Sequence, residues 1–118
     1  MKKINSTFFL LFSLILQQAN AATYYITSKS GDDSRTNTQA QNQTTPWKSS
    51  NKIKGLALGA GDQVLFERCG NYPGTIQLGQ GITVVGVAGN PVVIDAYGVE
   101  EVPMLTGAEL ITSAWTKY

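Results

Sequence analysis

Acidic side chains are the residues of this sequence that could carry out acid–base chemistry. Two carboxylates that flank a glycosidic bond form the catalytic pair of most glycosidases. Asp62 lies in a turn, where its side chain can also cap the backbone. Asp95 is the one acidic residue within the apolar stretch 92–97. The alternative to a catalytic role is that its side chain simply points outward. The six candidates are Asp62, Glu67, Asp95, Glu100, Glu101 and Glu109. Nothing in their spacing selects a pair, so the sequence assigns no catalytic residue.

Two neighbouring acids, Asp32 and Asp33, follow Gly31 and suggest a calcium site. An EF-hand loop needs carboxylates at alternating positions and a closing Glu, which are missing, so a solvated turn is favoured. The sequence contains no His, which removes the usual general base and the commonest metal ligand. No metal ligand and no cofactor-binding residue is therefore assigned.

Cys69 is the single cysteine, so the chain cannot form an internal disulfide. We expect it to be a small buried residue. A reactive thiol or an intermolecular bridge is the alternative. A cysteine nucleophile needs a histidine as its base, and the chain has none.

Four aromatic side chains could stack on sugar rings, although packing in the core or in a cap is the commoner use of such residues. They are Trp47, Tyr72, Tyr97 and Trp115. The glycine pairs at 59–61 and 79–81 lack the further residues of a phosphate-binding loop, so they indicate turns. Asn42-Gln43-Thr44 matches a glycosylation sequon, which matters only in a eukaryotic secretory pathway.

The N-terminus has the pattern of a signal peptide. Lys2 and Lys3 precede an apolar run at 8–16, which is too short to span a bilayer, and Ala19-Asn20-Ala21 fits the small-x-small cleavage rule. A buried N-terminal helix is the alternative. We expect residues 1–21 to be removed by cleavage after Ala21, which predicts a secreted, periplasmic or cell-surface protein with its domain at 22–118.

The charge and the apolar content of the chain limit the kinds of partner that it could bind. The chain has 9 basic and 8 acidic residues, and two of the basic ones lie in the predicted signal peptide. No basic face is implied, so nucleic acid is a poor candidate partner. No apolar run in the sequence is long enough to span a membrane.

Short apolar segments separated by turn residues dominate the rest of the chain. Gly61 and Asp62 make a turn before the central strand at 63–68. We expect further strands at 22–28, 75–78, 82–87, 92–97, 104–105 and 109–112. Residues 29–45 are polar throughout and predict an exposed loop. Thr45-Pro46-Trp47 predicts the start of a helix over 46–54 that docks through Trp47 and Ile53.

The strand pattern predicts an all-β architecture. Several strands are apolar at consecutive positions, which is typical of parallel sheets. Parallel strands usually need helical crossovers, and none is predicted between these strands. A coiled solenoid, in which each strand pairs with the strand one turn further along, resolves the conflict. A small antiparallel sandwich is the alternative.

Several short motifs also follow one another in a characteristic order. The segments 45–49, 61–68, 74–76, 89–98 and 105–107 read TPWKS, GDQVLFER, GTI, GNPVVIDAYG and LTG. This series resembles the N-terminal portion of secreted bacterial right-handed parallel β-helix proteins, the pectate-lyase-like superfamily. The resemblance implies a helix that caps the first coil and catalytic groups on later coils, beyond Tyr118. One departure is Cys69, where a Gly commonly stands. The chain thus resembles a fragment that carries the cap and the first coils.

The resemblance leaves two function classes open. One is a carbohydrate-active enzyme, a polysaccharide lyase or a glycoside hydrolase, acting on an extracellular polysaccharide. A lyase of this kind often uses Ca²⁺ to neutralise a substrate carboxylate, so Ca²⁺ is an expectation for the full-length protein only. The alternative is a non-catalytic surface or adhesive β-helix protein. Neither class fixes an oligomeric state.

Overall fold

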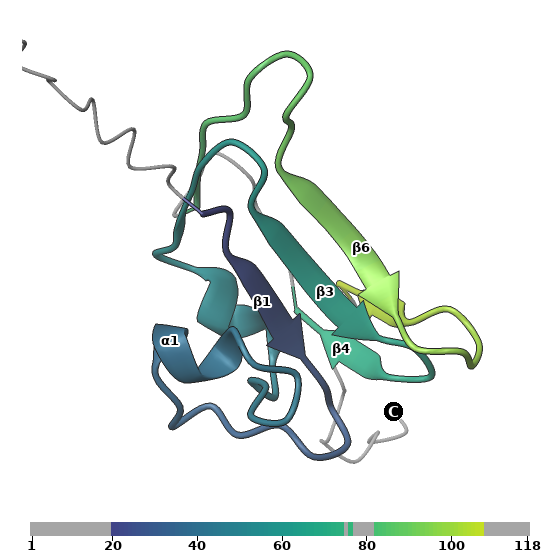
Figure 1. Ribbon diagram of the computed structural model, residues 1–118. Helices are drawn as coiled ribbons and strands as arrows, with labels where there is room; N and C mark the ends of the chain where they lie inside the picture. Colours follow the sequence, from purple (N-terminus) through teal and green to yellow (C-terminus); the bar gives the residue numbers. More distant parts are fainter. Residues whose placement is uncertain (1–19, 75, 77–81, 108–118) are drawn as a thin grey trace, which may run out of the picture.

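Short strands dominate the described part of the chain, residues 20–74, 76 and 82–107 of the computed structural model (Figure 1). The strands are β1 (Thr23–Ile26), β2 (Ala57–Leu58), β3 (Gln63–Glu67), β4 (Asn71–Pro73), β5 (Thr83–Val84), β6 (Val93–Tyr97) and β7 (Met104–Thr106). The helices are α1 (Asn37–Ala40) and the 3-10 helix η1 (Ser50–Ile53). The expected all-β class is confirmed.

All pairings between these strands are parallel. β1, β3 and β6 form a three-stranded sheet, with Tyr24 opposite Val64 and Val64 opposite Ile94. β5 pairs with β2, and β7 pairs with β4. Figure 1 shows β1, β3 and β6 side by side. The antiparallel sandwich is therefore wrong for the described strands.

The chain passes through the three sheets in a repeating order. β2, β3 and β4 each lie in a different sheet, and β5, β6 and β7 then return to those sheets in the same order. Between β2 and β7 the described residues contain no helix, so the connections there are loops. Within the described residues, these parallel strands are therefore connected by loops and not by the helical crossovers that parallel strands usually require.

The core lies between the sheets, because alternate strand residues point inward. Tyr24 and Ile26 on β1, and Val64 and Phe66 on β3, are buried, and the residues between them point to the other face. Trp47 stacks on the Tyr24 ring at a centroid distance of 5.5 Å. The buried apolar set is Tyr24, Ile26, Ala40, Trp47, Ile53, Leu56, Leu58, Val64, Phe66, Tyr72 and Ile82.

The predicted helix over 46–54 is wrong, except for its last turn. Trp47 lies in extended backbone beside β1: its N–H donates to the Tyr25 carbonyl and its carbonyl accepts from the Thr27 N–H. A backbone paired in this way cannot be helical, so only Ser50–Ile53 forms a helix. Trp47 and Ile53 are nevertheless fully buried, as expected of the residues that cover the first strand.

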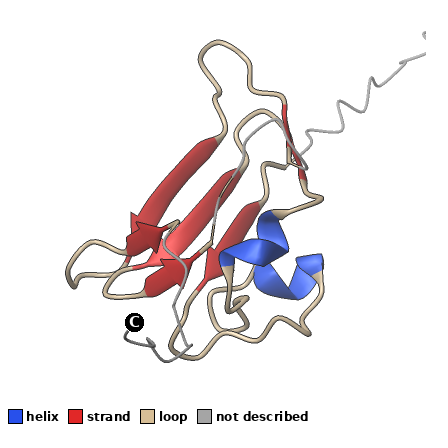
Figure 2. Ribbon diagram, turned by 180° about the vertical axis from the view of Figure 1, so that it is seen from behind, coloured by secondary structure: helices blue, strands red, loops and turns tan. Residues whose placement is uncertain are grey.

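The polar stretch 29–45, which the sequence predicts as an exposed loop, contains α1 and a buried Ala40. Thr36 and Gln39 form a reciprocal capping box at the start of α1. Gly31 lies against β1, where a Cβ would overlap the carbonyl oxygens of Thr27 and Trp47. Figure 2 shows the two helices together at one end of the strand layers. This loop therefore covers the β1 end of the molecule.

The remaining expectations are partly outside the described residues. The strand expected at 82–87 is shorter and comprises Thr83–Val84, whereas those at 92–97 and 104–105 are confirmed as β6 and β7. Most of the strand expected at 75–78, all of that at 109–112, and residues 1–19 of the predicted signal peptide lie outside them. In the part that is described, no helix has the length and apolar character that a membrane crossing requires.

Candidate functional site

The acidic residues take up separate positions. Asp62 caps a turn, as its place in the sequence suggests: its Oδ2 accepts from the Gly59 N–H at 2.8 Å. Asp95 is exposed, and its Oδ1 accepts from the N–H of Ala96 at 2.7 Å. Glu100 and Glu101 are exposed on the loop between β6 and β7, and Glu109 lies outside the described residues. The structure therefore assigns no catalytic pair among them.

Asp32 and Asp33 shape the loop that covers β1. The Asp33 carboxylate accepts three hydrogen bonds, from the backbone N–H of Lys48 and from the N–H and the hydroxyl of Ser49, at 2.7 to 3.0 Å. Burial raises the pKa of Asp33, but these hydrogen bonds outweigh it and hold the pKa below its usual value. Asp32 accepts from the Ser34 N–H. Across the described ranges, no group of three or more His, Cys, Asp or Glu side chains could hold a metal.

Cys69 is exposed, so the expectation of a buried residue is wrong. It occupies the turn between β3 and β4 with a φ of 61°, the left-handed region that favours glycine. Its N–H donates to the Glu101 carbonyl, which ties the turn to the loop after β6. The tight turn, rather than core packing, determines where the side chain points.

The candidate aromatic residues divide between the core and the outer face. Trp47 and Tyr72 are buried, and Phe66 packs edge-on against Tyr72 at 4.9 Å. Tyr97 is half-buried on the outer face of the three-stranded sheet, where it makes an edge contact with Tyr25 at 5.3 Å. Trp115 lies outside the described residues. Tyr97 is therefore the only one of these four that the structure places on a surface within its described ranges.

Charged groups surround this outer aromatic pair. Glu67 is half-buried and accepts a hydrogen bond from the Thr27 hydroxyl. Burial, followed by the charge of Glu67, raises the pKa of Tyr97 to about 12. A shallow hollow of about 170 Å³ adjoins Glu67, and its lining residues are Lys29, Glu67, Arg68, Gly98, Val99 and Glu100.

An ion pair closes one side of this hollow. The Nζ of Lys29 donates to Glu100 at 2.7 Å, and this contact raises the pKa of Lys29 and lowers that of Glu100. Strand geometry puts Tyr25 on the face of β1 opposite to Tyr24, but the sequence could not predict that Tyr25 and Tyr97 meet. That contact depends on β3 lying between β1 and β6.

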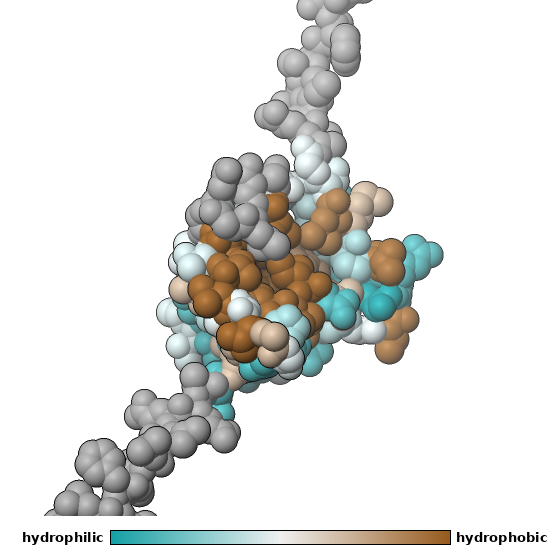
Figure 3. All heavy atoms as spheres, turned by 90° about the horizontal axis from the view of Figure 1, so that it is seen from above, coloured by the Kyte–Doolittle hydropathy of each residue, from teal (hydrophilic) through white to brown (hydrophobic). Residues whose placement is uncertain are grey.

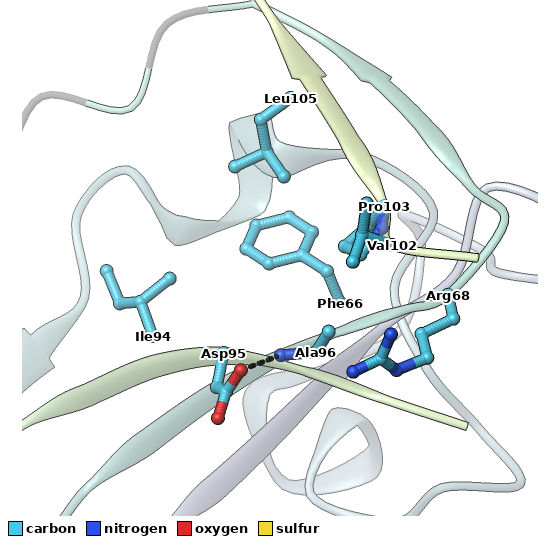
Figure 4. Close-up of a pocket in the computed structure, with 8 residues that line it drawn as sticks. All are labelled: Phe66, Arg68, Ile94, Asp95, Ala96, Val102, Pro103 and Leu105. Atoms are coloured by element: carbon cyan, nitrogen blue, oxygen red, sulfur yellow. Dashed lines mark hydrogen bonds between the residues drawn. The ribbon is translucent and has the colours of Figure 1, made fainter. Parts of the chain in front are cut away.

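A second hollow lies at the β6 end of the core. Its volume is about 290 Å³, and Figure 4 shows Phe66, Ile94 and Leu105 pointing toward one another while Asp95 points away. In the described residues, β6 has a strand partner only on its β3 side. Figure 3 shows hydrophobic side chains gathered on one face of the molecule. The exposed large apolar residues are Val84, Val85, Val87, Val99, Val102, Met104 and Leu105.

The two ends of the strand layers are therefore different. The β1 edge is occupied by the extended segment at Trp47 and by the helices, whereas β6 presents an unpaired edge beside an apolar hollow. An unpaired strand edge is a template for another strand. Among the described residues, β6 therefore has an edge on which another strand could pair, whereas the β1 edge already pairs with the segment at Trp47.

Comparison with known proteins points to sugar-cleaving enzymes. No protein-family profile matches the sequence. The chain is 35% identical over 85 residues to a lacto-N-biosidase of Bifidobacterium longum subsp. longum, a match that covers 68% of this chain and 5% of that protein. The solved structure of a GH136 lacto-N-biosidase from Eubacterium ramulus matches with a TM-score of 0.56 and 32% identity, over 67% of this chain and 12% of that one.

The two matches cover only a small part of each relative's own length. The chain spans only 5% of the curated relative and 12% of the solved one. Both matched proteins are glycoside hydrolases by name, which agrees with the expectation of a carbohydrate-active protein over the matched part. The chain has homologues among carbohydrate-active enzymes and shares with them a mostly β fold over the matched part.

Proposed function

We propose that this chain is the N-terminal part of an exported glycoside hydrolase that acts on extracellular oligosaccharide or polysaccharide. The observation that supports this most is the 32% identity and TM-score of 0.56 to a GH136 lacto-N-biosidase over two thirds of the chain. By that likeness the substrate would be a sugar chain that carries lacto-N-biose. A lyase is less well supported, because the relatives are hydrolases by name.

The role of this segment would be to begin a right-handed parallel β-helix. The repeated order of the three sheets and the purely parallel pairing support a coiled chain. The covered β1 edge corresponds to a cap, and the open β6 edge with its apolar hollow is the surface on which a next coil would stack. Coils of this kind bury their faces only against neighbours.

The catalytic groups would lie on later coils. A hydrolase needs two carboxylates on either side of the glycosidic bond, and their separation sets the stereochemical outcome. In this segment Asp33 and Asp62 already bind backbone N–H groups, and Glu100 is paired with Lys29. A non-catalytic surface or adhesive β-helix remains the second candidate, because it requires the same capped first coils and no acid pair.

Export is part of the proposal. Lys2, Lys3 and the apolar run at 8–16 form a signal peptide that would be cleaved after Ala21, which leaves Ala22 at the N-terminus of a secreted, periplasmic or surface protein. N-terminal sequencing of the exported protein tests this. Intact Met1 on protein from the soluble cytoplasmic fraction would contradict it.

The activity test uses the longest protein that the gene encodes. We expect it to release lacto-N-biose, or new reducing ends, from at least one member of a panel of lacto-N-biose-containing oligosaccharides and extracellular polysaccharides. Parallel reactions with added Ca²⁺ and with chelator determine whether that ion is needed. If folded protein releases no sugar from any member of the panel, the hydrolase proposal is wrong and the non-catalytic alternative is favoured.

A further inference from the structure

Asp62 holds the backbone nitrogen of Ala22, the residue that the proposed export would leave at the N-terminus. The Ala22 N–H donates to Asp62 Oδ1 at 2.7 Å, across 40 positions of sequence. The other carboxylate oxygen accepts from the Gly59 N–H at 2.8 Å, which fixes the side chain in its turn. The Asp62 carboxylate is therefore oriented toward one particular nitrogen.

The surroundings of this nitrogen are already arranged by β3. The Ala22 carbonyl accepts from the Gln63 N–H at 2.8 Å, and the pairing of β1 with β3 begins at the next residue, Thr23. Ala22 is half-buried and packs against the core, whereas Ala21 is exposed. The nitrogen thus lies between the exposed Ala21 and the start of β1 at Thr23.

Processing changes the chemistry of this nitrogen without moving it. Cleavage adds water across the Ala21–Ala22 peptide bond, so that Ala21 leaves with a carboxylate and Ala22 retains an amine. Below its ordinary pKa of about 7.7–8.0 this amine is an ammonium group with three N–H donors. Hydrogen bonds between an ammonium group and a carboxylate are stronger than those from a neutral amide and have N···O distances of about 2.7–2.9 Å. The distance to Asp62 Oδ1 already lies in this range.

We propose that Asp62 is the binding site for the mature N-terminal ammonium group and that leader removal strengthens the docking of β1 on β3. This inference rests on the proposed cleavage after Ala21 and not on any sugar-cleaving activity. Before cleavage Asp62 accepts from a neutral amide; after cleavage it forms an ion pair. Removal of the leader then adds stability to the first strand of the exported protein.

The test is a thermodynamic cycle on the full mature chain that begins at Ala22. Four proteins are compared: free or acetylated at the Ala22 nitrogen, each with Asp62 or with Asp62→Asn. Acetylation is the matched control, because it restores an amide at the same nitrogen and changes nothing else in the chain. The unfolding equilibrium constant is measured in urea at pH 6.5 and low salt.

With Asp62 present, we expect the free ammonium group to stabilise the folded state roughly tenfold relative to the acetylated chain. With Asp62→Asn, the same comparison should give less than about a twofold difference. If acetylation changes the unfolding equilibrium constant equally with Asp62 and with Asp62→Asn, the proposal is overturned. Asp62 would then only cap its turn and would not bind the ammonium group. Comparison at two salt concentrations should show the tenfold effect shrinking as salt rises.

A second measurement keeps the proposal testable if Asp62→Asn does not fold. The charged group that faces Ala22 is Asp62, and the neighbouring turn that approaches Gly61 presents the neutral amide of Asn90. Pairing raises the ammonium pKa above its ordinary value, so its stabilisation is complete below about pH 7.7 and is lost as pH rises through the raised value. The free and acetylated proteins should therefore converge in stability near pH 10, and a pH-independent difference would overturn the proposal.

The proposal fails separately from the proposed function. An exported protein that begins at any residue other than Ala22 overturns the ammonium site even if the full protein cleaves sugars. Conversely, if the full protein cleaves no sugar, the thermodynamic cycle still tests the ammonium site, because it measures folding stability and not activity.

Discussion

Trp47 should be the residue on which the covered end of the molecule depends most. Its ring is fully buried and stacked on Tyr24, and its indole Nε1 donates to the Arg35 carbonyl at 2.8 Å. That hydrogen bond joins the loop before α1 to the extended segment beside β1. Trp47→Phe keeps an aromatic ring for stacking but removes the donor and leaves a void where the larger ring was.

The expected cost follows from these two losses. A part-buried carbonyl without its donor costs about 1–3 kcal/mol, and shrinking a fully buried side chain adds about 1 kcal/mol or more for the void. We expect Trp47→Phe to lower the free energy of unfolding by about 2–4 kcal/mol. For a domain of this size that is a fall in melting temperature of at least about 8 °C.

The assay is urea and thermal unfolding of the exported chain, followed by far-ultraviolet circular dichroism. Tyr25→Phe is the matched control, because it removes one hydroxyl from a half-buried ring on the outer face of β1, and it should cost less than about 0.5 kcal/mol. A Trp47→Phe protein within about 0.5 kcal/mol of the wild type would refute the reasoning that this indole anchors the cap.

Three further outcomes follow from single contacts. Asp33→Ala removes a carboxylate that accepts three hydrogen bonds and should cost about 1–2 kcal/mol at pH 7 in urea unfolding. Because the pKa of Asp33 is lowered, its contribution is present above about pH 3.9 and is lost as pH falls, so wild type and variant should converge in acid. Tyr97, with its pKa raised to about 12, should stay protonated at pH 11 in ultraviolet titration, and the folded state should lose stability as pH rises from 10 toward 12; a normal titration of every tyrosine would contradict this. Cys69→Gly should relieve the left-handed backbone and be up to about 1 kcal/mol more stable than Cys69→Ala, and the reverse order would show that the turn is unstrained.

The β6 end of the described molecule is the feature that bears most on the proposed function. Phe66, Ile94 and Leu105 line an apolar hollow beside the unpaired edge of β6. A soluble protein rarely leaves such an edge uncovered, because it pairs with other chains. The chain spans only 5% of the curated relative and 12% of the solved one.

The sequence by itself determined the local features. Strand geometry puts Tyr24 and Ile26 on one shared face of β1, because successive strand residues point to opposite sides, and that face is the buried one. The turn before β3 and the capping role of Asp62 also follow from nearby residues, since Gly and Asp act on their own backbone. The turn residues between the later strands likewise favoured parallel strands joined by loops, which is what the described residues between β5 and β7 show.

Only the tertiary structure decided the features that join distant residues. Trp47 follows a good helix-start signal, yet it is extended because its backbone pairs with β1, about twenty positions earlier. Cys69 is exposed because the β3–β4 turn takes a left-handed conformation that nothing in its neighbours announces. The contact of Tyr25 with Tyr97, and that of Ala22 with Asp62, exist only once β1, β3 and β6 are stacked in register. Local patterns fix which way a side chain points, but the partner it meets depends on strand pairing across the whole chain.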